Sequence, residues 1–219
     1  MYPSLKRKLI IFDLDGTLID SSADIAWAAN KTLSQMGYPE MDAAAIKKCI
    51  GRGVRSLMSL LMPSEPSERI DLARDVFLEH YGSHLTVSTT LYPGTMDTLE
   101  YLKGAGKNMA IVTNKPIGLT EAILDSLEIR DYFSAVLGGD SLLNKKPHPE
   151  PLLKILDLLQ TTLEDAVFIG DSRTDIETGH AASVATIGAA YGFRGRKELE
   201  DAGCSIVIED IAGLIRIIR

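Results

Sequence analysis

Residues 9–18 decide the fold of this chain; they read Leu9-Ile10-Ile11-Phe12-Asp13-Leu14-Asp15-Gly16-Thr17-Leu18. The apolar run predicts a buried β-strand that ends at two carboxylates, Asp13 and Asp15. Because these residues are two positions apart, their side chains leave the strand on broadly the same side. Carboxylates this close repel, so one tends to hold a proton unless a cation intervenes. The pair can supply an ionised nucleophile and a neutral acid, although an ordinary acidic turn would contain the same residues.

Short apolar runs alternate with helical patterns along most of the remaining chain. The predicted strands are residues 8–12, 109–112, 135–137, 166–169, 184–187 and 206–208. The predicted helices between them lie near residues 95–103, 118–127, 149–159 and 174–182. Single helices between near-continuous apolar strands indicate βαβ units, and therefore an α/β fold with a parallel sheet covered on both faces. Ligands bind such sheets outside the carboxyl ends of the strands.

Residues 20–85 break this alternation because they show helical patterns only. The predicted helices cover residues 25–36, 42–50, 54–62 and 67–80. A helical segment of this length, inserted after the first strand, is typical of a cap beside the site. We therefore expect two domains: an α/β core of residues 1–19 and 86–219, and an inserted α-helical cap of residues 20–85.

Composition excludes several classes of protein. The 219 residues are 45% hydrophobic, and the formal charge is −7, from 30 acidic and 23 basic residues. The apolar content is too high for a disordered chain, and an acidic protein offers no electrostatic case for binding nucleic acid. The apolar run before Asp13 is too short for a signal peptide or a membrane span, and the distant Cys49 and Cys204 do not indicate a disulfide or a zinc site. We expect a soluble cytoplasmic protein, either monomer or homodimer.

Three further segments place polar side chains where chemistry is expected. Thr113 and Asn114 follow a predicted strand and offer a hydroxyl and an amide to an anion, although both are common turn residues. Lys146 lies in a proline-rich approach to a helix, which would fix its position; the alternative is a solvated lysine pair. Asp171 follows another strand, and Asp175 lies four residues later. Carboxylates beside phosphate oxygens suit Mg²⁺, although Asp175 is also a favourable charge for a first helical turn.

In this order, the four segments resemble the motifs of the haloacid dehalogenase (HAD) superfamily of phosphohydrolases, and the resemblance covers essentially the whole chain. It implies a Rossmann-like (HAD-like) α/β core with a mobile helical cap. Within the superfamily, residues 19–24, 51–53 and 144–151 are most similar to phosphoglycolate phosphatases. Asp15 argues for phosphate chemistry, since family members that remove a halide lack an acid at this position.

The resemblance also implies a role for each motif residue. Asp13 would attack phosphorus and form an aspartyl-phosphate. Asp15 would protonate the leaving alkoxide and later accept a proton from the hydrolytic water. Mg²⁺ would be held by the Asp13 carboxylate, the backbone carbonyl of Asp15 and Asp171. The remaining residues would hold the phosphoryl oxygens (Thr113, Asn114 and Lys146) or orient Lys146 or a metal-bound water (Asp175).

The cap is expected to select the substrate. Residues 47–55 contain four basic side chains and no acid. Arg52, between two glycines, is the candidate to bind a second anionic group such as a carboxylate, because a guanidinium can do so bidentately. The alternative is a solvated basic turn.

The expected function is Mg²⁺-dependent hydrolysis of a small phosphorylated metabolite, with 2-phosphoglycolate considered first. A sugar-phosphate mutase similar to β-phosphoglucomutase, or a pyrophosphatase, could use the same scaffold. Cap lysines also leave open a phosphonate-cleaving enzyme. A phospho-receiver signalling module is a more distant alternative, because it needs no cap and places its acceptor in a different turn. Neither G-x-G-x-x-G after the first strand nor G-x-x-x-x-G-K occurs, which disfavours a nucleotide-binding domain.

Overall fold

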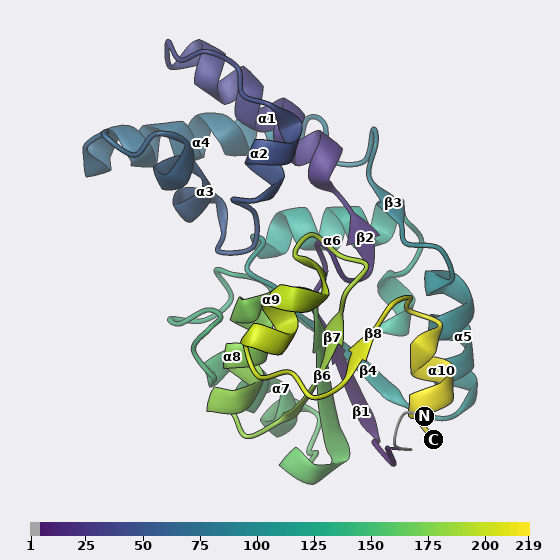
Figure 1. Cartoon of the computed structure of the whole chain (residues 1–219). Helices are drawn as coiled ribbons and strands as arrows, with labels where there is room; N and C mark the ends of the chain where they lie inside the picture. Colours follow the sequence, from purple (N-terminus) through teal and green to yellow (C-terminus); the bar gives the residue numbers. More distant parts are fainter. Residues whose placement is uncertain (1–4) are drawn as a thin grey trace.

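A six-stranded parallel sheet forms the centre of the computed structural model, which describes residues 5–219. Its order is β5-β4-β1-β6-β7-β8, with β1 near the middle (Figure 1). The strands are β1 (Leu9–Phe12), β4 (Asn108–Val112), β5 (Ala135–Leu137), β6 (Ala166–Gly170), β7 (Ala185–Ala189) and β8 (Val207–Ile208). Each lies within a residue or two of its predicted position. The α/β fold with a parallel sheet is therefore confirmed.

Helices cover both faces of this sheet. Alternate residues of β1 point to opposite faces, so Ile10 and Phe12 belong to one apolar cluster, and Leu9 and Ile11 to another. The core helices are α5 (Thr95–Gly104), α6 (Ile117–Ser126), α7 (Glu150–Leu158), α8 (Arg173–Ala181), α9 (Gly195–Asp201) and α10 (Gly213–Ile217), with short 3₁₀ helices at η1 (Arg130–Tyr132) and η2 (Leu163–Asp165). The first cluster includes residues of α5, α6 and α10, and the second includes residues of α7. The sequence patterns did not predict α9 or α10.

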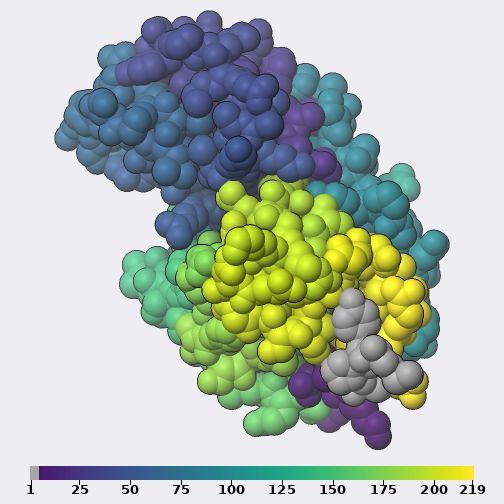
Figure 2. All heavy atoms as spheres, in the orientation of Figure 1, coloured from purple at the N-terminus to yellow at the C-terminus, as the bar shows by residue number. Residues whose placement is uncertain are grey.

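Four further helices form a lobe that lies over the carboxyl ends of the strands (Figures 1 and 2). They are α1 (Ser22–Gln35), α2 (Ala43–Lys47), α3 (Val54–Leu61) and α4 (Ser67–Gly82). The predicted helix at residues 42–50 ends early, at Lys47, and continues as a turn in which the backbone N–H groups of Cys49 and Ile50 donate to the carbonyls of Ile46 and Lys47. Several carbonyls beyond it accept hydrogen bonds from side chains of the core. Within residues 5–219, no helix combines the length and the apolar character needed to cross a bilayer.

A two-stranded antiparallel ribbon joins the helical lobe to the core. It consists of β2 (Ile19–Asp20) and β3 (Thr90–Leu91), in which Ile19 pairs with Leu91. Asp24, at the start of α1, is 1% exposed and accepts hydrogen bonds near this ribbon. Its Oδ2 accepts from the Ser88 backbone N–H at 2.9 Å, and from the backbone N–H and hydroxyl of Thr89 at 2.8 Å and 2.7 Å. Asp24 thus ties the first helix to the returning strand.

We expect Asp24→Asn to lower the free energy of unfolding by about 1–3 kcal/mol, because an amide nitrogen cannot accept these hydrogen bonds and buried donors lose a partner. Urea denaturation measures the change. Asp42→Asn is the matched control: Asp42 is an exposed N-cap, and asparagine caps helices equally well. If Asp24→Asn lowers the free energy of unfolding no more than Asp42→Asn does, Asp24 does not hold α1 to the returning strand.

Candidate active site

The strand register brings the sequence motifs to one edge of the sheet. Phe12 pairs with Ile111 of β4 on one side and with Ile169 of β6 on the other. The residues just beyond these strand ends therefore meet. They are buried, and they comprise Asp13, Thr113, Asn114, Lys115 and Asp171. Gly16 has φ +84°, and a Cβ there would lie 2.3 Å from Asp171 Oδ2. Only glycine allows the first motif to approach the fourth this closely.

Lys146 lies between two carboxylates. Its Nζ is 2.8 Å from Asp13 Oδ1 and 2.7 Å from Asp175 Oδ1. Burial opposes the charge on this lysine, but the carboxylates of Asp13 and Asp175 outweigh it, and the pKa of Lys146 is raised. Asp175 also accepts hydrogen bonds from the backbone and the hydroxyl of Ser172, at 3.1 Å and 2.6 Å, which begins α8 with a capping box. Asp175 thus both caps a helix and positions Lys146.

Three buried carboxylates form an acidic cluster at this edge. Asp13, Asp171 and Asp175 offer oxygens that all lie within 4.8 Å of one another. Burial raises the pKa of Asp13 to about 6, against the attraction of Lys146, and burial with the charges of Asp175 and Asp13 raises the pKa of Asp171 well above its ordinary value. One ammonium group cannot balance three carboxylates. The cluster consists of hard oxygen donors with excess negative charge, which fits Mg²⁺.

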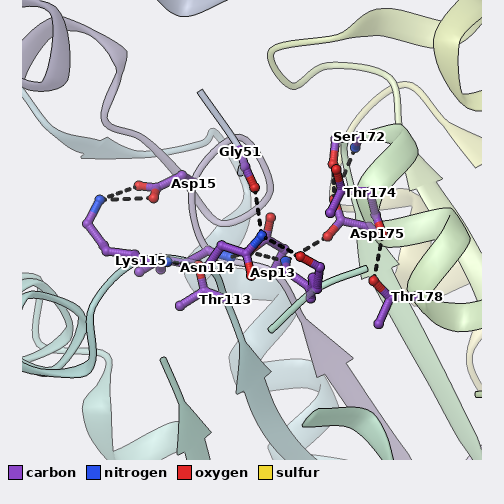
Figure 3. A network of polar contacts seen from close by, with 12 residues as sticks. Asp13, Asp15, Gly51, Thr113, Asn114, Lys115, Ser172, Thr174, Asp175 and Thr178 are labelled. Atoms are coloured by element: carbon purple, nitrogen blue, oxygen red, sulfur yellow. Dashed lines mark hydrogen bonds and ion pairs between the residues drawn. The ribbon is translucent and has the colours of Figure 1, made fainter. Parts of the chain in front are cut away.

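A second lysine, Lys115, pairs with Asp15. Its Nζ lies 2.7 Å and 2.9 Å from the two Asp15 carboxylate oxygens, and the Ser21 hydroxyl donates to Asp15 Oδ1 at 2.5 Å. Figure 3 shows this pair on one side of Asp13, with Asp175 and Ser172 on the other. The sequence motifs alone indicated no role for Lys115. The available signal was its position directly after Thr113 and Asn114 at a strand end.

Asn114 uses its amide differently from the sequence expectation. Its Nδ2 donates to the backbone carbonyls of Gly51, at 3.0 Å, and Lys146, at 3.1 Å, so the donor predicted for a phosphoryl oxygen is engaged (Figure 3). The Asn114 Oδ1 is buried without a hydrogen-bond partner among the described residues. Thr113 accepts a hydrogen bond from the Lys115 backbone at 3.3 Å, and its own hydroxyl proton remains available for an anion.

An apolar chamber with a cavity volume of about 50 Å³ lies above these carboxylates. Its floor includes Asp13, Asp15, Thr113, Asn114 and Lys115. Its walls come mainly from the helical lobe and comprise Ile25, Ile50, Gly51, Gly53, Val54, Leu57, Phe77 and Tyr81, with Pro116 and Leu119 from the core. Arg52 is exposed and does not line this chamber; it lines a separate groove with Arg55 and Lys145.

The helical lobe is held over the site through the backbone of residues 48–52, which we call the carbonyl loop. Arg194 of the core donates to the carbonyls of Lys48, at 2.5 Å, and Ile50. Lys145 donates to the carbonyl of Arg52 at 3.0 Å, and Asn114 donates to that of Gly51. Four of the five carbonyls in the carbonyl loop thus accept hydrogen bonds from three side chains of the core, and the loop covers the acidic site.

Sequence comparisons extend over nearly the whole chain. The family model for haloacid dehalogenase-like hydrolases matches residues 10–189. A phosphoglycolate phosphatase of Aquifex aeolicus is 41% identical, over 85% of this chain and 86% of that protein. Proteins of the same name from Psychrobacter arcticus and Pseudomonas putida are 36% and 33% identical, covering 96% and 98% of this chain and 95% and 81% of their own lengths.

Solved structures show the same architecture. A haloacid dehalogenase-like hydrolase from Bacteroides fragilis superposes with a TM-score of 0.91 at 28% identity, covering 95% of this chain and 100% of that one. A predicted phosphoglycolate phosphatase from Haemophilus somnus gives 0.89 at 32% identity, covering 96% and 97%. The motif geometry, the matched family model and these relatives agree, and the chain belongs to the haloacid dehalogenase-like hydrolase family.

Proposed function

We propose that this phosphatase hydrolyses a small phosphomonoester, 2-phosphoglycolate first, through an aspartyl-phosphate on Asp13. The observation that carries the proposal is the placement of Asp13 and Asp15 on one chamber floor, each beside its own lysine. The names of the relatives from Aquifex aeolicus and Psychrobacter arcticus support the choice of substrate. The proposal includes a cytoplasmic location and a cap domain of residues 20–85 that opens for exchange.

The proposed reaction has two steps. In the first, an oxygen of Asp13 attacks phosphorus, the ester P–O bond breaks, and Asp15, which must be in its protonated form for this step, gives its proton to the leaving alkoxide. Lys146 offsets negative charge on the phosphoryl oxygens, and the Thr113 hydroxyl donates to one of them. In the second, Asp15 accepts a proton from water, which attacks the aspartyl-phosphate. Phosphate leaves and the Asp13 carboxylate is restored.

The acidic cluster supports a magnesium requirement. The carboxylates of Asp13 and Asp171 and the backbone carbonyl of Asp15 would hold the ion, with Asp175 beside them. Bound Mg²⁺ would supply positive charge that balances the cluster and stabilises charge on the phosphoryl group. The oxygen-only donor set and the raised pKa values of Asp13 and Asp171 are the observations behind this assignment.

A phosphate-release screen over small phosphorylated metabolites, with and without Mg²⁺, tests the proposal. We expect the highest turnover on a small carboxylated monoester. Fast release from pyrophosphate alone would identify a pyrophosphatase, and interconversion of sugar phosphates without net release would identify a mutase. A stable phosphoprotein without turnover would favour a signalling module. Each of these outcomes would replace the proposed activity.

Asp15→Asn gives a mechanistic test within the same screen. We expect about a 100-fold loss of turnover on 2-phosphoglycolate, because its alkoxide leaving group needs a proton. The loss of kcat/KM on p-nitrophenyl phosphate should be much smaller, since nitrophenolate leaves without one. The comparison uses kcat/KM because this constant reports the steps up to departure of the leaving group and not the later hydrolysis, in which Asp15 acts on both substrates alike. Equal losses of kcat/KM would exclude Asp15 as the proton donor.

A further inference from the structure

Lys115 is a buried cation for which the proposed mechanism has no use. Its side chain is 4% exposed, and within residues 5–219 it forms an ion pair with Asp15 alone. An ammonium group has three donors, and the two contacts with Asp15 leave at least one for another acceptor. Burial opposes its charge, but Asp15 outweighs burial, so the pKa of Lys115 is raised and the lysine stays positive. The chamber floor therefore contains one ammonium group, which is paired with the Asp15 carboxylate.

Tyr81 of α4 lies beside this lysine and lines the same chamber. The Lys115 ammonium is 4.7 Å from the centre of its ring. The residue is 2% exposed, and its hydroxyl is buried without a well-formed hydrogen bond among the described residues. A buried hydroxyl without a partner is costly unless a ligand supplies one. Burial also raises the pKa of Tyr81 to about 12, so the hydroxyl keeps its proton.

We infer that Lys115 determines specificity: its ammonium group, together with the hydroxyl of Tyr81, binds a carboxylate carried by the leaving group of the substrate. The inference rests on the proposed function and deepens it. The substrate class is the phosphomonoester whose ester carbon bears a carboxylate directly. Both donors border the chamber, and a carboxylate has enough lone pairs to satisfy both.

The position of Lys115 fits the length of such a substrate. Asp15 must reach the ester oxygen to protonate it, and Lys115 Nζ is 2.7 Å from the nearer Asp15 oxygen. A carboxylate carbon two bonds beyond the ester oxygen therefore falls beside the lysine. Val54, Leu57 and Phe77 give the chamber apolar walls, and a charge pair is stronger beside such walls than in bulk water.

The other cations near the site are less suited to this role. Lys146 is already paired with both Asp13 and Asp175 and is not among the residues that line the chamber. Arg52, which the sequence analysis chose, is exposed in a groove with Arg55 and Lys145. Among the described residues that line the chamber, Lys115 is the one cation. A carboxylate inside the chamber would therefore meet Lys115 before any other positive group.

The test compares 2-phosphoglycolate with its neutral carboxamide analogue, and uses the ratio of the two kcat/KM values. Lys115→Met also disturbs Asp15, but that effect falls on both substrates and cancels in the ratio. We expect the ratio to fall by about 10- to 100-fold in Lys115→Met, the size of a charge-assisted hydrogen bond. Tyr81→Phe should lower it by about threefold, because it removes the hydroxyl together with its interaction with the Lys115 ammonium. Lys197→Met, in the exposed α9, is the matched control and should leave the ratio unchanged.

The outcomes distinguish a failure of the inference about Lys115 from a failure of the proposed function. If the wild-type protein hydrolyses 2-phosphoglycolate but Lys115→Met and Tyr81→Phe keep the wild-type ratio, the inference is wrong and the proposed function stands. A ratio that falls in Arg52→Ala instead would assign the carboxylate to Arg52. If the wild-type protein releases phosphate from no monoester, the proposed function itself fails, and no variant is needed to see it. Circular dichroism checks folding, and Tyr81→Phe decides the question if Lys115→Met does not fold.

Discussion

Replacing Asp13 by asparagine is expected to reduce phosphate release by a factor on the order of 10⁵–10⁶, the size of effect seen when a hydrolase loses its covalent nucleophile. The amide has nearly the same shape as the carboxylate, so substrate should still enter the chamber. It cannot attack phosphorus as the carboxylate does. Rapid acid quenching of single turnovers should trap a phosphorylated wild-type chain and none in Asp13→Asn.

The same substitution is expected to preserve stability. Asp13 is one of three buried carboxylates that face a single ammonium, and its pKa is raised to about 6. Above that pH, the ionised Asp13 costs the metal-free fold free energy, and a neutral amide removes this cost. Lys146 keeps its contact with Asp175 at 2.7 Å. The thermal midpoint of metal-free Asp13→Asn should therefore not fall below that of the wild-type protein.

Asp75→Asn, an exposed aspartate of α4, is the matched control and should change neither turnover nor midpoint. Two results would oppose the assignment of Asp13. Turnover within tenfold of the wild-type value would show that another group attacks phosphorus. A loss of activity accompanied by a large fall in the midpoint would show that Asp13 is needed to build the site rather than to react in it.

Removing divalent cations with a chelator is expected to lower phosphate release by about 10³-fold or more, since charge stabilisation by a metal is worth several kcal/mol. Without the ion, Asp13, Asp171 and Asp175 repel one another and the incoming phosphate dianion. Added Mg²⁺ should restore turnover. Undiminished release in excess chelator would contradict the magnesium assignment.

A second measurement makes this prediction independent of turnover. A ligand that binds only the folded state raises the free energy of unfolding, so Mg²⁺ should raise the thermal midpoint of the wild-type protein. In Asp171→Asn the increase should be much smaller, because one ligand and one of the charges that attract the ion are lost. Asp75→Asn should respond to Mg²⁺ as the wild-type protein does. A midpoint that is insensitive to Mg²⁺ in all three proteins would argue against a site at the cluster.

The sheet could be predicted from sequence because its signal is local. Each buried strand is an apolar run, and helices of several turns separate the strands, so residue patterns suffice. The two-residue strands β2 and β3 carry no such signal, since their pairing depends on where the helical lobe begins and returns. The end of α2 at Lys47 was also missed. Side chains distant in sequence, Arg194 and Asn114, bind the carbonyls that follow it.

The candidate site also combines residues that a local sequence signal predicts with residues whose contacts depend on distant parts of the chain. Asp13, Asp15 and Asp171 follow strands directly, so the order of the strands is enough to bring them together. The partners of Lys115 could not be predicted, because Asp15 lies 100 positions away and Tyr81 belongs to a helix of the other lobe. Arg52 was chosen from the local density of positive charge. That density does not reveal that the chamber faces the neighbouring Gly51 and Gly53 instead.

The contact between the lobe and Arg194, Lys145 and Asn114 is made through main-chain oxygens of the carbonyl loop. Main-chain oxygens are present whichever amino acids occupy positions 48–52. Mutation at positions 48, 49, 50 and 52 can therefore change the side chains above the site without removing these contacts, whereas Gly51, with φ +120°, favours glycine. Over evolution, the side chains of the loop can therefore change, and with them the substrate that is selected. Arg194, Lys145 and Asn114 meanwhile continue to hold the loop over the site.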